Sequence, residues 1–231
     1  MGLWSVVRED FGIIVQKDPA IKSRVELFFN YPRLIALVYY RIAHKIHDAG
    51  FKVIARVIMG ITGLLTQVDI HPAAKIGRRV FIDHAIGVVI GETAEVGDDV
   101  TIYQGVSLGG TSSEKVKRHP TICNGVVIGA GAKILGNIVI GENAKIGANS
   151  VVIKDVPKDC TAVGIPARVI VKGRAKEASA INKLPDIDRA LFEYLFKRVQ
   201  ILENAQNNGE CKKEIENLES IYEHFLQSLK N

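Results

Sequence analysis

The sequence predicts an α+β protein in which helices precede a parallel β-helix and a further helical region follows it. Three observations support this fold class. Apolar residues recur at every sixth position through the middle of the 231-residue chain, helical patterns flank that region on both sides, and the repeat is interrupted twice. We therefore expect three parts, at residues 1–66, 67–172 and 173–231.

The first part carries helical patterns over its whole length. One helix is expected after Asp18–Pro19, and a second begins near Pro32, which suits a first helical turn, and stops at Gly50. The third, at residues 51–66, is apolar on most of its faces. A helix of that kind has to be buried, and we expect it to pack against another subunit.

The middle part repeats every six residues. Neither an α-helix nor a single β-strand has this period, but a short strand followed by a tight turn, repeated three times per coil, does. Each repeat then points one apolar residue into a prism-shaped core, and the glycine that often follows it allows the turn. These core positions are Ile70, Ile76, Ile82, Ile90, Val96, Ile102, Leu108, Ile122, Ile128, Ile134, Ile140, Ile146 and Val152.

The repeat is broken at two places, and both breaks carry polar, titratable residues. Two extra residues lie between Ile82 and Ile90, where the chain reads Asp83–His84, and fourteen positions separate Leu108 from Ile122. The longer break ends in "RHP" at residues 118–120. A solenoid ejects insertions as loops, often on its functional face, so we expect the functional site at these breaks.

The third part is predicted to be helical, with an apolar stripe at coiled-coil-like spacing that suits oligomerisation or docking. The stripe consists of Ile215, Leu218, Tyr222, Phe225 and Leu229.

The composition excludes several classes of protein. The longest uncharged apolar stretch, residues 57–68, is shorter than the roughly 20 residues that cross a bilayer, and no signal-peptide pattern opens the chain. Three widely spaced cysteines fit neither a disulfide framework nor a zinc site, so we expect a cytoplasmic protein without a membrane anchor. The net charge of +5 comes without a nucleic-acid-binding motif, which argues against a nucleic-acid partner.

Five short motifs narrow the prediction. They are "DPA" at 18–20, "DIHP" at 69–72, "DHA" at 83–85, "LGGT" at 108–111 and "RHP" at 118–120. Together with the repeats, they resemble the serine O-acetyltransferase family of hexapeptide-repeat acyltransferases over about residues 10–172. The resemblance implies a left-handed coil, L-serine as acceptor, acetyl-CoA as co-substrate and no metal.

His84 is our candidate for the base that removes the proton of the acceptor hydroxyl. A neutral imidazole does this near pH 7, and general-base catalysis typically accelerates a reaction about 10²–10⁴-fold. By resemblance, Asp69 is the carboxylate that orients this imidazole. Fifteen residues separate the two, which is close to one coil, so we expect them to be neighbours.

The resemblance also assigns the groups that bind the substrates. Asp18 and Asp83 hold the ammonium of serine, and Arg118, aided by His119, holds its carboxylate, for which the planar guanidinium is suited. These residues come from three separate stretches, as a site between subunits of a trimer requires. For CoA the resemblance implies Gly110, Thr111, Ala130 and Ala148 along the groove and, for its phosphates, Lys145 and Arg168.

Other functions are open at this point. A hexapeptide acetyltransferase for a sugar or other small acceptor would use the same base, and a trimeric metal lyase would need His71, His84 and His119 as ligands. A non-catalytic scaffold would need none of these groups. The family implies a trimer or dimer of trimers, feedback inhibition by L-cysteine and binding to O-acetylserine sulfhydrylase, although this chain ends in Asn231 rather than the usual Ile.

Overall fold

The computed structural model describes residues 2–17, 32–171, 194–195, 197–202 and 220. The chain divides into two units, residues 1–173 and 174–231, and the few described residues of the second unit are helical. The helix predicted after Asp18–Pro19 and the five residues of the predicted C-terminal stripe lie outside the described residues. No helix among the described residues is long and apolar enough to cross a membrane.

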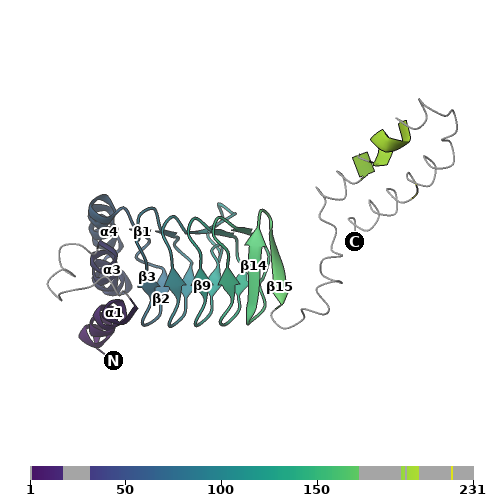
Figure 1. Cartoon of the computed structure of the whole chain (residues 1–231). Coiled ribbons are helices and arrows are strands. Elements are labelled where there is room, and N and C mark those ends of the chain that lie inside the picture. The colour runs from purple at the N-terminus through teal and green to yellow at the C-terminus, as the bar shows by residue number, and fades with distance from the viewer. Residues whose placement is uncertain (1, 18–31, 172–193, 196, 203–219, 221–231) are drawn as a thin grey trace. The chain divides into compact units, whose positions relative to one another are not determined.

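Three helices lie together at one end of the solenoid: α1 (Leu3–Lys17), α3 (Pro32–Asp48) and α4 (Lys52–Thr66) (Figure 1). α3 and α4 confirm the second and third predicted helices to within two residues at each end. Between them lies Gly50 with a φ of +93°, a conformation that glycine adopts without steric cost.

Buried polar groups of α3 tie the helices to the first coil. The hydroxyl of Tyr40 accepts a hydrogen bond from the backbone N–H of Ile76 at 3.1 Å. Arg41 pairs with the fully buried Asp10 of α1, with 3.1 Å between Nε and Oδ2, and donates to the carbonyl of Gly77 at 2.6 Å. α1, α3 and the solenoid are therefore joined by one hydrogen-bonded network.

The described residues form fifteen short strands that wind into a left-handed β-helix with three sheets (Figure 1). The first sheet contains β1 (Asp69–Ile70), β4 (Val89–Ile90), β7 (Ser107–Gly109), β10 (Lys133–Leu135) and β13 (Val151–Val152). The second contains β2 (Lys75–Ile76), β5 (Glu95–Val96), β8 (Thr121–Ile122) and β11 (Val139–Ile140). The third contains β3 (Phe81–Ile82), β6 (Thr101–Ile102), β9 (Val127–Ile128), β12 (Lys145–Ile146), β14 (Cys160–Gly164) and β15 (Ala167–Val171).

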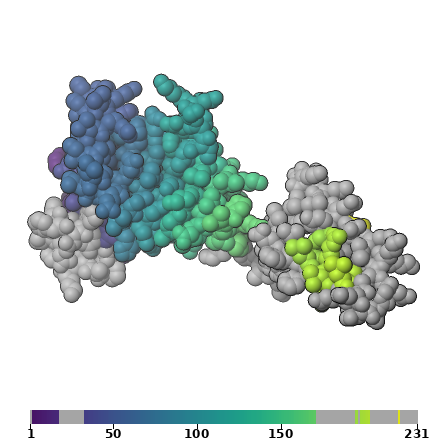
Figure 2. Space-filling view, turned by 90° about the horizontal axis from the view of Figure 1, so that it is seen from above, coloured from purple at the N-terminus to yellow at the C-terminus, as the bar shows by residue number. Residues whose placement is uncertain are grey.

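The strand register confirms the predicted repeat. Strands pair in parallel with the strand one coil later, except β14 and β15, which close the solenoid as an antiparallel pair. A regular coil consists of three six-residue repeats, as in the pairing of Val127 with Lys145. The coil from Phe81 to its partner Thr101 is longer by the two inserted residues, and the coil from Thr101 to its partner Val127 is longer by the eight residues of the second insertion. In Figure 2 the longer loop projects, in teal, from the body of the solenoid.

The predicted core positions are buried, with Ile70, Ile102 and Ile134 among the largest fully buried side chains. Two lines of turns matter for the site. The His84 edge joins the third sheet to the first and comprises residues 83–88, 103–106, 129–132 and 147–150. The Arg118 edge joins the first sheet to the second and comprises residues 71–74, 91–94, 110–120 and 136–138.

Candidate active site

His84 lies on the first break of the repeat in an unusual backbone conformation. Its φ is +56° and that of Ala85 is +65°, so two successive residues with side chains occupy the left-handed region. Each such residue costs on the order of 1–3 kcal/mol, and this kind of strain clusters at functional sites. The imidazole itself is 71% exposed and accessible to a substrate.

Asp83 contacts His84 through both of its carboxylate oxygens. Oδ1 accepts a hydrogen bond from the backbone N–H of His84 at 3.0 Å, and Oδ2 lies 3.9 Å from its Nε2. Oδ1 also forms an ion pair with the guanidinium of Arg33, whose side chain is 7% exposed. Sequence reasoning missed Arg33 because it lies in the first turn of α3 and belongs to no motif.

Asp69 lies at the start of β1 with its side chain in solvent. It pairs in register with Val89, five positions beyond His84, because this coil is longer than the separation of Asp69 and His84 in the sequence. Both residues are described by the structure, and no hydrogen bond or ion pair joins them. The role of Asp69 as the orienting carboxylate therefore stays a prediction, while Asp83 is the carboxylate in contact with the base.

His119 is held on the Arg118 edge by Thr93. The ring Nδ1 accepts from the backbone N–H of Thr93 at 3.2 Å and lies 2.9 Å from its hydroxyl. Burial, followed by repulsion from Arg118, lowers the pKa of His119, which favours the neutral ring. Because Nδ1 is an acceptor, the proton is assigned to Nε2. This nitrogen lies close to Gly110, since a Cβ added to that glycine would be 3.2 Å from it. The ring also fills the space beside Gly91, where a Cβ would lie 2.0 Å from it.

Arg118 is engaged within the chain. Its Nη2 lies 3.0 Å from Oε2 of Glu92, and its Nη1 donates to the carbonyl of Ser112 at 3.1 Å. Both partners of the ion pair are partly exposed, so the pair adds little stability and its carboxylate can be exchanged for another. Sequence reasoning missed Glu92 and Thr93, whose contacts arise only when the longer loop folds back over the previous coil.

The predicted CoA residues fall into two groups. On the His84 edge, neighbouring coils approach closely, with the N–H of Asn149 donating to the carbonyl of Ala130 at 2.8 Å and a Cβ position on Gly129 only 2.6 Å from the nitrogen of Ala148. Gly110 and Thr111 belong to the Arg118 edge, and Lys145 and Arg168 are exposed on the third sheet. One chain alone therefore does not bring these residues together.

The same division applies to the groups predicted to bind serine. Asp83 and His84 lie on one edge of the solenoid, Arg118 and His119 lie on another, and Asp18 lies outside the described residues. His71 belongs to the Arg118 edge, where its Nδ1 accepts from the backbone N–H of Ala73 at 3.0 Å. Within the described part of the chain, no cluster of His, Cys, Asp or Glu suits a metal ion.

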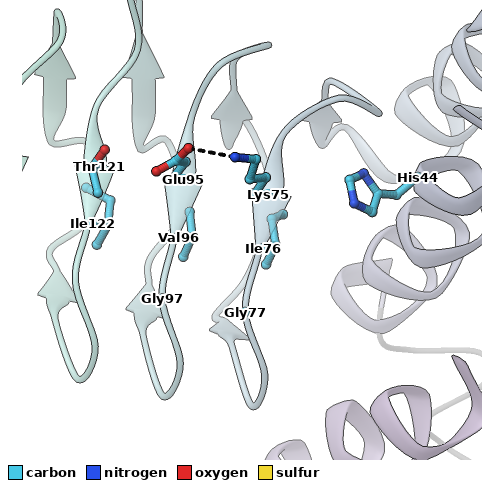
Figure 3. Close-up of a pocket in the computed structure, with 9 residues that line it drawn as sticks. All are labelled: His44, Lys75, Ile76, Gly77, Glu95, Val96, Gly97, Thr121 and Ile122. Carbon is cyan, nitrogen blue, oxygen red and sulfur yellow. Dashed lines mark hydrogen bonds and ion pairs between the residues drawn. The ribbon is translucent and has the colours of Figure 1, made fainter. Parts of the chain in front are cut away.

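An open depression of about 430 Å³ lies beside α3, over the outer face of β2, β5 and β8 (Figure 3). His44 faces it from the helix, and Lys75 and Glu95, 3.1 Å apart, project from the strands. The described residues that line it include none of the predicted site residues, so it is separate from the candidate active site.

The left-handed solenoid and its exposed histidine at a break of the repeat define a hexapeptide-repeat acyltransferase. In agreement, the family model described as bacterial transferase hexapeptide (six repeats) matches residues 119–154. A serine acetyltransferase of Synechococcus elongatus is 48% identical over 203 residues, which are 87% of this chain and 83% of that protein. The chain belongs to the serine acetyltransferase family, as its motifs predicted.

Solved structures agree with this assignment. Soybean serine acetyltransferase complexed with serine is 46% identical, with a TM-score of 0.70 over 73% of this chain and 69% of that one. A serine acetyltransferase complex with cysteine is 44% identical, with a TM-score of 0.70 over 73% and 70% of the two chains. Serine acetyltransferase from Brucella abortus in complex with coenzyme A is 45% identical, with a TM-score of 0.70 over 73% and 68%.

Proposed function

We propose that the chain transfers the acetyl group of acetyl-CoA to the hydroxyl of L-serine, giving O-acetyl-L-serine and CoA. Membership of the serine acetyltransferase family supports this reaction, as do the related structures that hold serine and coenzyme A. The observation of this chain that carries the proposal is the exposed imidazole of His84, held in a left-handed turn against the carboxylate of Asp83.

His84 acts as the general base. Its imidazole takes the proton of the serine hydroxyl while the hydroxyl oxygen attacks the carbonyl carbon of the thioester. The carbon–sulfur bond then breaks, and the proton held by the imidazolium passes to the leaving sulfur. The carboxylate of Asp83, 3.9 Å from Nε2, stabilises the imidazolium, and we assign Asp69 a similar role by resemblance.

The amino-acid acceptor is selected by its two charges. Asp83 and Asp18 bind the ammonium, while Arg118 and the Nε2–H of His119 bind the carboxylate. In the free chain the carboxylate of Glu92 pairs with the guanidinium of Arg118 at 3.0 Å. When serine binds, its carboxylate replaces that of Glu92. A sugar acceptor carries neither charge, which favours serine over the sugar alternative.

The complete site requires more than one copy of the chain. His84 and the pair that binds the serine carboxylate, Arg118 and His119, lie on different edges of one solenoid. The His84 edge of one copy therefore has to face the Arg118 edge of another, as in a trimer. CoA would lie in the groove between these edges, because its predicted contacts are divided in the same way. The outward face of α4 is apolar and supports association, with Val53 76%, Leu64 85% and Leu65 73% exposed in the single chain.

Three further assignments complete the proposal. L-cysteine keeps the ammonium and carboxylate of serine and would compete for the same clamp, in line with the related structure that holds cysteine. We extend the proposal to a cytoplasmic location, since Cys123 and Cys160 are free thiols. O-acetylserine sulfhydrylase is a candidate partner, as the family resemblance implies.

An acceptor screen tests the reaction. Purified chain and acetyl-CoA are incubated with L-serine, other amino acids and a panel of sugars, and the release of free thiol is followed. We expect thiol release with L-serine and the appearance of O-acetylserine. Rapid release with a sugar but none with serine would refute the proposed acceptor.

A further inference from the structure

We propose that Arg33 is a positioning residue for His84 and acts through the carboxylate of Asp83. The inference rests on the proposed function, because it takes His84 as the base of acetyl transfer. It assigns a role to a residue that carries no motif and lies about fifty positions away from the base in the sequence, on the helical part of the chain.

Arg33 is a buried cation that contacts an aromatic ring and a carboxylate. Its side chain is 7% exposed, its guanidinium carbon lies 5.3 Å from the ring centroid of Phe81, and its Nη1 pairs with Oδ1 of Asp83. Phe81 packs in turn with Ile14 and Leu34 in the small apolar cluster between the helices and the third sheet. An arginine keeps its charge in such a place, so Asp83 always faces a cation.

This contact determines how the two oxygens of Asp83 are used. Oδ1 is shared between the Arg33 guanidinium and the backbone N–H of His84, at 3.0 Å, and Oδ2 is left facing the imidazole at 3.9 Å. The shared Oδ1 therefore fixes the backbone of His84 in its left-handed conformation, at a φ of +56°. Without Arg33, Oδ1 loses its ion-pair partner, and the side chain of Asp83 is held less firmly against the backbone of His84.

Arg33 leaves one carboxylate oxygen of Asp83 available for the substrate. A carboxylate has two oxygens, and the guanidinium occupies only one of them, so Oδ2 remains for the imidazole or for an ammonium. Serine also keeps Asp18 for its ammonium and Arg118 with His119 for its carboxylate, so loss of Arg33 should impair the orientation of the base more than the binding of serine. This separates a positioning role from a role in the substrate site.

The test compares Arg33→Met with Arg33→Lys. Met keeps the apolar stem over Phe81 but removes the charge, whereas Lys keeps the charge without the planar fork. We expect R33M to lower kcat about 10- to 100-fold, as misplacement of a catalytic group does, with the KM for serine changed less than about threefold. R33K should recover a substantial part of the lost kcat.

Arg78→Met is the matched control. Arg78 also joins the helices to the solenoid, through an ion pair with Glu9 of α1, but contacts none of the predicted site residues that the structure describes. R78M should keep the parental kcat and KM. If R78M lowers kcat as much as R33M does, the effect comes from loosening the helices and the proposal is wrong.

His84→Ala supplies the second readout. H84A alone should lower kcat at least about 10²-fold, and R33M in the H84A background should change the residual rate less than about twofold, because Arg33 acts only through the base. An equal loss from R33M in both backgrounds would overturn the proposal. If H84A keeps the parental rate, the base assignment itself is wrong, whereas a slow H84A beside an unimpaired R33M rejects the role of Arg33 alone.

Should R33M fail to fold, R33K carries the test. It keeps the buried charge, and its smaller loss of kcat should likewise vanish in the H84A background. A loss that persists there, or parental kcat in R33K with an unfolded R33M, indicates a purely structural arginine.

Discussion

The buried pair between Asp10 of α1 and Arg41 of α3 offers the sharpest test of how the helices are attached to the solenoid. Arg41 donates to both carboxylate oxygens of Asp10, at 3.1 and 3.3 Å, and to the carbonyls of Ile76 and Gly77 in the first coil. Burial raises the pKa of Asp10, and the arginine opposes that effect. The change to make is Asp10→Asn, which keeps the shape of the side chain and removes its charge.

The expected loss follows from the burial of the partner. Arg41 is only 7% exposed, so D10N leaves a buried guanidinium whose hydrogen-bond partners are all neutral. Removing one member of a buried pair costs about 3–5 kcal/mol, and the remaining amide oxygen favours the lower end, about 3 kcal/mol. For a unit of roughly 150–250 residues this corresponds to a melting temperature lower by roughly 6–12 °C.

The assay is thermal unfolding at one fixed protein concentration, since association also affects the melting temperature. Glu9→Gln is the control, because it removes one negative charge from the neighbouring position of α1, where the partner is the solvent-accessible Arg78. We expect E9Q to change the melting temperature only slightly. If D10N and E9Q lower it by the same amount, the buried pair does not join the helices to the coil.

Two further predictions concern the Arg118 edge. Arg118→Lys keeps the charge but loses the planar fork, so the KM for serine and the inhibition constant for cysteine should rise together; weakened use of serine with unchanged inhibition would place cysteine elsewhere. The pKa of His119 is lowered from 6.5, mainly by burial. Below pH 6.5 the unfolded chain therefore binds more protons than the folded chain. The free energy of unfolding should then fall as the pH drops. His119→Gln should make this fall shallower but not abolish it, because the pKa of His71 is lowered too. Urea unfolding at about pH 7.5 and about pH 5.5 measures the fall in the free energy of unfolding. An equal fall in the variant and the parent would contradict the role of His119.

The fold was largely predictable because its main determinant is local and periodic. Core positions such as Ile102 and Ile134 are fully buried, as the six-residue repeat predicted. The two breaks also lengthened their coils as expected, each by the number of residues inserted. The hand of the coil came from the family resemblance, because the same spacing of apolar residues fits either hand.

The contacts of the site were less predictable, because they depend on how separate segments dock. Asp83 was expected to bind substrate, but the sequence gives no sign that Arg33 reaches it from α3. The separation of Asp69 and His84 suggested neighbours, yet the coil at that point is five residues longer than their spacing. The partners of His119 and Arg118, which are Thr93 and Glu92, likewise depend on the path of the inserted loop.

In a coil of three repeats, the residues that fill the core do not determine on which edge of the solenoid a later residue lies. An apolar residue at every sixth position keeps the core filled whichever face of the prism that residue comes from. Removing one six-residue repeat from between Ala130 and Ala148 would therefore leave the core intact but turn all later residues by a third of a turn, moving Ala148 off the edge it shares with Ala130. Whole coils are thus the units that can be gained or lost without moving the groove, and single repeats are not.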